Sequence, residues 1–154
     1  MPPLVVKSPQ SLKELVGRRI GVTEWFCVTQ ERIEQFAEAT EDRQWIHLDR
    51  ARASKESPYG TTIAHGFLTL SLISYFMKEV IQFQGGVRLT VNYGLNRVRF
   101  PAALPAGSRI RGCIEVQAIK ELSDSVEAMY AVTIEREKSA KPVCVAEWAV
   151  RYYL

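Results

Sequence analysis

Cysteine is scarce in this sequence of 154 residues, and its spacing excludes two kinds of site. Cys27, Cys113 and Cys144 lie far apart, and no pair has the two-residue gap that is common in zinc sites. An odd number at wide spacing also provides no disulfide framework. We therefore expect reduced thiols and a cytoplasmic protein.

The sequence also lacks a hydrophobic run long enough to cross a bilayer. The best candidate, residues 63–77, is shorter than the roughly 20 residues required, and it contains a histidine and three hydroxyl side chains. The apolar run Leu4–Val6 is too short for the core of a signal peptide. We expect no membrane partner.

A strong excess of charge is absent as well. The net charge is +3 at pH 7, and such a small, scattered excess does not indicate a nucleic-acid partner. Five arginines nevertheless gather on two strand-like segments: Arg88, Arg97, Arg99, Arg109 and Arg111. A solvated sheet face explains them, and contact with the phosphates of a thioester carrier is the alternative, for which Arg97 is our candidate.

Residues 64–81 carry apolar side chains on nearly every side of a helix, which is typical of a buried helix. The pair Gly85–Gly86 is expected to end it. Earlier, a short helix after Ser8 is expected to stop at Gly17, and Thr29 is placed to cap a helix whose Ile33, Phe36, Ala37 and Thr40 share one face.

Strands are expected at 20–28, which carries Trp25, Phe26 and Val28, and at 87–100, which is bounded by Pro101, Pro105 and Gly107. Alternating apolar residues predict three more, at 109–119, 126–134 and 143–152. The last four are long and are joined by short turns, which favours an antiparallel sheet. The pattern therefore predicts an α+β fold, in which a long buried helix is wrapped by a curved antiparallel sheet. A free edge of that sheet could pair with a second copy.

Only two histidines occur, and both lie in or beside the segment 41–63, which has no sustained periodicity. His47 follows Asp42 by five residues. A carboxylate and an imidazole near one water can take a proton from it and return one to a substrate carbon. The alternative is that Asp42 caps a turn while His47 packs as a half-buried polar residue.

Gly66 lies in the first turn of the predicted buried helix, where its backbone N–H has no helical partner and no side chain blocks approach. Such an N–H can hold a thioester carbonyl oxygen as negative charge develops. Close packing against a loop is the alternative. Ser74 follows two turns later. Its hydroxyl either lies near the same side of the helix as Gly66 or donates a hydrogen bond back to the carbonyl of Leu70. No carboxylate–histidine spacing supports a metal site on His47 and His65, so we expect no metal.

Three ordered segments carry a family resemblance: FAEATEDRQWIH at 36–47, IAHGFLTLSL at 63–72 and NYGLNRVRFP at 92–101. The sequence resembles the MaoC-like dehydratase family, which includes (R)-specific enoyl-CoA hydratases, and within it the nodulation protein N-like branch. The resemblance implies a single hot-dog domain over residues 1–154 and a homodimer joined through sheet edges.

By position, Asp42 and His47 match the catalytic pair of that family, Gly66 matches the glycine that binds the thioester oxygen, and Ser74 matches a helix serine near the active site. Many members have Gly-Asp-x-Asn-Pro before the histidine pattern, whereas here Glu41 replaces the first glycine and Gln44–Trp45 replace Asn-Pro. The large Trp45 and His65, which precedes Gly66, complete the expected substrate-binding residues.

The function implied by the resemblance is reversible hydration of trans-2-enoyl thioesters to (R)-3-hydroxyacyl thioesters. The substrate partner is an acyl-CoA or an acyl-carrier thioester, and no cofactor is expected because coenzyme A is part of the substrate. Two alternatives stay open, a hot-dog thioesterase and a non-catalytic module that binds acyl thioesters.

Overall fold

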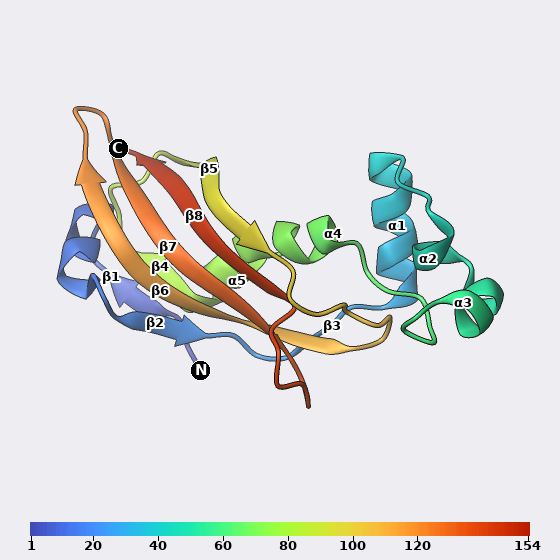
Figure 1. Ribbon diagram of the computed structural model, residues 1–154. Coiled ribbons are helices and arrows are strands. Elements are labelled where there is room, and N and C mark those ends of the chain that lie inside the picture. Colours follow the sequence, from blue (N-terminus) through green and yellow to red (C-terminus); the bar gives the residue numbers. More distant parts are fainter.

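The computed structural model describes all 154 residues, and its main feature is one curved antiparallel sheet (Figure 1). The strands are β2 (Arg19–Val22), β3 (Phe26–Cys27), β5 (Leu89–Arg99), β6 (Arg109–Glu121), β7 (Ser125–Arg136) and β8 (Cys144–Tyr153). Their order is β2-β6-β7-β8-β5, and β3 also pairs with β6. The four long predicted strands are confirmed, since the alternation along β7 and β8 buries one face and leaves the other half-exposed.

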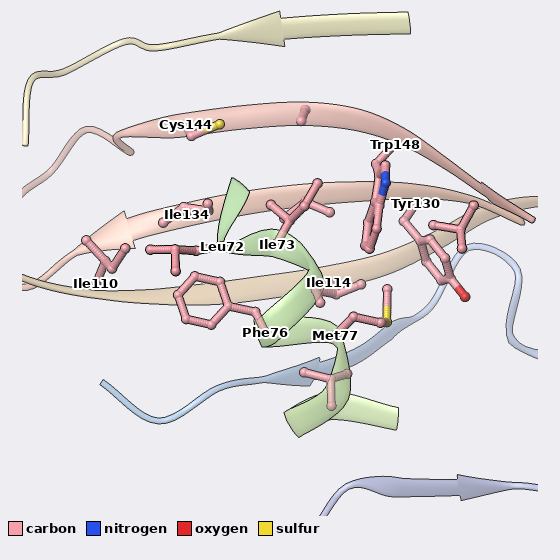
Figure 2. Close-up of a cluster of buried hydrophobic side chains, with 14 of the residues drawn as sticks. Leu72, Ile73, Phe76, Met77, Ile110, Ile114, Tyr130, Ile134, Cys144 and Trp148 are labelled. Atoms are coloured by element: carbon pink, nitrogen blue, oxygen red, sulfur yellow. The ribbon is translucent and has the colours of Figure 1, made fainter. Parts of the chain in front are cut away.

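Two helices in line, α4 (Gly66–Ser71) and α5 (Ile73–Val80), lie against the buried face of this sheet. Figure 2 shows Leu72, Ile73, Phe76 and Met77 pointing from the helices toward side chains of β6, β7 and β8. These contacts belong to one core of 27 buried residues. The predicted α+β arrangement, with a sheet curved around a central helical segment, is confirmed.

The central segment differs from the single helix predicted over residues 64–81. At Leu72 the backbone (φ −73°, ψ −10°) makes a tighter turn, in which its N–H bonds to the carbonyl of Thr69. The helix is also not buried on every side: Phe67 is 70% exposed and Tyr75 42% exposed, because nothing in this chain covers that side.

The helix ends at Val80 rather than at Gly85–Gly86. The next residues form β4 (Ile81–Phe83), which pairs in parallel with β1 (Leu4–Val6). Between β1 and β2, the 3₁₀ helix η1 (Pro9–Leu15) confirms the short N-terminal helix, and its Leu12 is fully buried. Periodicity missed the β1–β4 pair because three-residue strands contain too few alternations.

The first predicted strand, 20–28, is interrupted. Strands β2 and β3 both pair with β6, but Thr23 lies between them, and its side chain accepts a hydrogen bond from the N–H of Gly112 at 2.9 Å. The hydroxyl thus replaces one bond of the ladder, while the N–H of Thr23 still donates to the carbonyl of Gly112 at 2.9 Å.

Three helices form a group beyond one end of the sheet, next to the start of α4 (Figure 1). They are α1 (Gln30–Thr40), α2 (Trp45–Leu48) and α3 (Arg50–Glu56). Thr29 caps α1 as predicted, since its hydroxyl accepts the N–H of Arg32 at 3.2 Å. No helix in the structure combines the length and the apolarity that a membrane crossing requires.

Candidate active site

The chain reverses direction directly after α1, and this reversal places Asp42. Glu41 occupies the left-handed region with φ of 65°, at the position where helices commonly end on glycine. Arg43 forms ion pairs with Glu41 and with Glu38 of the last helical turns. The reversal therefore holds despite the absence of glycine, and Asp42 is exposed beside the two histidines.

His47 is buried in the one-turn helix α2, and its ring has a defined tautomer. Its Nδ1 lies 2.7 Å from the carbonyl oxygen of Ile63. Because a carbonyl can only accept, Nδ1 carries the hydrogen and Nε2 keeps its lone pair in the neutral ring. His47 can thus accept a proton at Nε2 while Ile63 holds the ring in place.

His65 lies behind His47 rather than in a substrate cavity. The two rings stack with centroids 3.8 Å apart and an angle of 23° between planes. The Nε2–H of His65 donates to the backbone carbonyl of Asp42 at 2.9 Å, which leaves Nδ1 buried and without a partner. Phe36 packs on His65 at 4.9 Å. A substrate-binding role of His65 stays a prediction; in this structure the residue connects Asp42 to His47.

Asp42 and the two histidines come together as a group. One carboxylate oxygen of Asp42, one ring nitrogen of His47 and one of His65 all lie within 4.8 Å of one another. This spacing suits a single bridging water, since each hydrogen bond to it spans about 2.8 Å. Two histidines and a carboxylate can also bind a metal ion. The stacked rings oppose that use, because in-plane lone pairs of nearly parallel rings do not converge on one ion.

The surroundings of His47 favour its neutral form. Burial lowers the pKa of His47 below its ordinary value of 6.5, and the neighbouring His65 lowers it further. The hydrogen bond to Ile63 and the charge of Asp42 oppose this change without reversing it. At neutral pH the ring is therefore an unprotonated base.

Gly66 opens α4 directly after His65, so its N–H has no acceptor within the helix. The ring of Phe100 lies over it, and a Cβ added at Gly66 would approach that ring to 3.1 Å. Gly66 also lines a mostly apolar cavity of about 210 Å³ together with Ala64, Leu104 and Val143. A side chain at this position would therefore require the ring of Phe100 to shift by a few tenths of an ångström.

Ser74 lines a different space from Gly66. Two adjoining cavities of about 290 and 340 Å³ share Ser74, Asn92 and Trp148 and follow α4 and α5 along β5 and β8. Ser74 lies 3.5 Å from the side-chain amide of Asn92. These two cavities form a mainly apolar groove, here called the helix groove, which ends near Phe83 and Tyr152.

The structure does not bring the remaining candidates into the site. Trp45 begins α2, and its ring packs under the guanidinium of Arg52 at 4.2 Å. Arg97 is exposed on edge strand β5, opposite Glu147, on the sheet face away from the core. The expected contact of Arg97 with the phosphates of the substrate therefore stays a prediction.

Two residues that hold His47 were missed in the sequence. The side-chain amide of Gln30 donates to the backbone carbonyl of His47 at 2.7 Å, and Thr62 donates to Gln30 at 2.5 Å. Both Gln30 and Thr62 are buried. Gln30, at the first position of α1, gives no signal in periodicity, and its partners are 17 and 32 residues away.

Comparison with known proteins places this fold and these residues in context. The sequence model of the MaoC like domain matches residues 11–138. The chain is 46% identical over 147 residues to 3-hydroxyacyl-thioester dehydratase Z of Mycobacterium tuberculosis (strain ATCC 25618 / H37Rv), covering 95% of this chain and 96% of the relative. It is 41% identical over 139 residues to nodulation protein N of Rhizobium leguminosarum bv. viciae, covering 86% and 83%.

Solved structures match the fold. The R-hydratase PhaJ1 of Pseudomonas aeruginosa superposes with a TM-score of 0.71 at 24% identity, over 90% of this chain and 81% of that one. The curved sheet around a central helical segment is thus the hot-dog fold.

Proposed function

The chain belongs to the MaoC-like dehydratase family and is a hydro-lyase, and we propose that it reversibly hydrates trans-2-enoyl thioesters to (R)-3-hydroxyacyl thioesters. The similarity to a 3-hydroxyacyl-thioester dehydratase supports the thioester class of substrate. The observation that carries the proposal is the placement of Asp42 within 4.8 Å of His47, a buried base with a bare Nε2.

In the proposed mechanism one water lies between Asp42 and His47. His47 accepts a proton from the water at Nε2, and the water oxygen forms a bond to C3 of the enoyl thioester. The Asp42 carboxylate orients the water and stabilises the imidazolium that forms. The proton then passes from Nε2 to C2, so that one complete water has added across the double bond.

Gly66 supplies the electrophilic part of this mechanism. Its free N–H donates a hydrogen bond to the thioester carbonyl oxygen, which gains negative charge as oxygen adds to C3. Water, the thioester and the side chains account for every atom transferred. The proposed reaction therefore uses no protein-bound cofactor, and coenzyme A enters only as part of the substrate.

The helix groove is the proposed site for the acyl chain. Its walls are mainly apolar, with Ile73, Met77 and Trp148 among them, and Ser74 and Asn92 are the polar groups between its two halves. A groove of this kind buries hydrocarbon and orients it through a few polar contacts. Phe83 and Tyr152 at its end set the longest chain that fits.

We also propose that two copies pair through β5. Every residue of β5 except Val98 is exposed, including Val91, Tyr93 and Leu95, and the strand has a free edge. Phe67 and Phe100 extend the exposed apolar surface next to it. A long exposed edge beside apolar side chains is a site for pairing with another chain.

The test follows the conjugated thioester absorbance of a short enoyl-CoA with purified protein, together with chiral analysis of the product and detection of free thiol. The proposal predicts loss of absorbance, formation of the (R)-3-hydroxyacyl-CoA and no thiol release. Thiol release with the enoyl bond intact would instead indicate a thioesterase, and binding without turnover a non-catalytic module.

A further inference from the structure

A cavity of about 410 Å³ lies outside the site described above. It opens on the outer face of the sheet, between Trp25 and the turn that joins β7 to β8. Its basic side chains are Arg111, Arg136, Lys138 and Lys141. We call this space the basic cavity.

Most of the positive charge in the basic cavity is not neutralised by neighbouring carboxylates. Glu135 is the one acidic residue in its lining, and it is paired with Arg111 at 2.8 Å. The adjacent carboxylate of Glu137 is paired with Arg109. No carboxylate lies within ion-pair distance of the remaining three basic residues, Arg136, Lys138 and Lys141, whose charges are left for an anion.

The framework of the cavity is held by local contacts. The guanidinium of Arg111 lies 4.6 Å above the ring of Trp25, so the aromatic wall is fixed to the ion pair with Glu135. In the turn, Lys138 adopts a positive φ of 60°, and the hydroxyl of Ser139 donates to the carbonyl of Lys141 at 3.0 Å. The turn thus presents both lysines to one space.

We propose that the basic cavity binds the phosphates of an adenosine nucleotide, with the base against the wall that contains Trp25. Clustered cationic side chains recognise phosphate oxygens, and an aromatic ring suits a planar base. A concave space of this size fits a small molecule, whereas a docked carrier protein needs a broad surface of about 800 Å². If the proposed function holds, the nucleotide that binds in this cavity is the nucleotide end of coenzyme A.

The position of the cavity agrees with that source. Pro142 lines the basic cavity, and the next residue, Val143, lines the apolar cavity that contains Gly66. The two spaces therefore lie on either side of the same turn. A thioester at Gly66 and phosphates at Lys138 are ends that a long, flexible carrier arm can connect.

The first test measures binding of adenosine 3′,5′-bisphosphate by isothermal titration calorimetry. The double variant Lys138→Asn/Lys141→Gln removes two charges and keeps a residue that tolerates positive φ at 138. Its matched control, Lys13→Gln/Lys120→Gln, removes the same charge from surface outside the cavity. We expect affinity to fall at least about tenfold in the first variant and to stay within about twofold of wild type in the control. Absent binding to wild type, or equal loss in both variants, would overturn the proposal.

The second test identifies the source of the nucleotide. In hydration assays with an enoyl-CoA and with the matching enoyl-pantetheine, the cavity variant is expected to raise KM for the CoA thioester alone and to leave kcat unchanged. If bisphosphate binding is lost while KM for the CoA thioester stays constant, the cavity serves a separate nucleotide. Because the binding test requires no turnover, its failure is distinguishable from failure of the proposed function.

Discussion

A single hydrogen bond determines how His47 can act. The carbonyl of Ile63 takes the Nδ1 hydrogen, so the remaining nitrogen can only accept while the ring is neutral. The stacked His65 and the buried surroundings keep it neutral by lowering its pKa. We propose that this arrangement makes His47 the base and leaves Asp42 to orient the water.

The pH dependence of hydration follows from this assignment. Since the pKa of His47 is lowered from 6.5, its base form persists below pH 6.5. We predict that kcat/KM rises with pH with a midpoint below 6.5, and that it falls only as pH drops through the lowered pKa. The charge of Asp42 raises the pKa of His47. In Asp42→Asn, the midpoint at which the residual activity falls in acid should therefore move to still lower pH. A midpoint above pH 6.5 would contradict the assignment.

The role of His65 can be separated into its stacked ring and its hydrogen bond. His65→Phe keeps a ring against His47 but removes the donor to the carbonyl of Asp42, whereas His65→Gln keeps a donor without the ring. We predict that the phenylalanine variant loses about 1 kcal/mol of unfolding free energy in urea, the typical contribution of one hydrogen bond. We expect the glutamine variant to retain a larger share of kcat. Identical behaviour of the two variants would argue against an anchoring role.

Residue patterns in the sequence located Asp42 and His47, and the structure brings them together. The sequence did not predict that the ring of His65 stacks on His47, because stacking is a property of side-chain packing that spacing does not encode. Gln30 and Thr62 escaped notice for a related reason, since their partners lie far away along the chain.

Among the elements, the turn after α1 shows how the chain tolerates a residue that its conformation disfavours. Glu41 adopts φ of 65°, which costs a non-glycine residue about 1 kcal/mol or more. Its ion pair with Arg43 is exposed to solvent and screened, so that it offsets only part of this cost.

We therefore predict that Glu41→Gly raises the free energy of unfolding by about 0.5–1 kcal/mol, measured in urea, with kcat unchanged. Glu38→Ala is the matched control, because Glu38 also pairs with Arg43 but lies in regular helix. The control should be neutral or slightly less stable than wild type. A stability loss in Glu41→Gly would show that the ion pair outweighs the backbone cost.

The same elements show the limits of periodicity. The four long strands were predicted to within a few residues, three of them because alternating positions define a face. Strand β5, whose residues are nearly all exposed, was delimited instead by the prolines and the glycine that follow it. The turn at Leu72 and the short strand β4 were not predicted. An apolar run indicates that a segment is buried, but it does not specify the backbone conformation of each residue. The apolar pattern of Val80–Phe83 is compatible with a helix and with a strand. Pairing with β1 makes residues Ile81–Phe83 a strand.

Taken as a whole, the molecule leaves one long sheet edge and its neighbouring apolar surface uncovered. Strand β5 pairs only with β8, and the exposed Phe67 of α4 lies near it on the border of the helix groove. A second copy paired on β5 would cover both.

We predict that the wild-type protein sediments as a dimer and that Phe67→Glu shifts it toward monomer in analytical ultracentrifugation, because a buried interface charge is costly. Val16→Glu places the same charge on an exposed apolar position after η1, outside the helix groove. This control should remain dimeric. A monomeric wild-type protein, or equal dissociation of both variants, would contradict the proposed pairing.

The most direct test of the catalytic assignment is single-turnover hydration of a short enoyl-CoA by wild type, Asp42→Asn and His47→Gln. Both substitutions keep size and hydrogen-bonding ability while removing the charge or the base. The account predicts that each lowers the rate of the chemical step by roughly 10²-fold or more, with substrate binding retained. Near wild-type rates in both variants would contradict it.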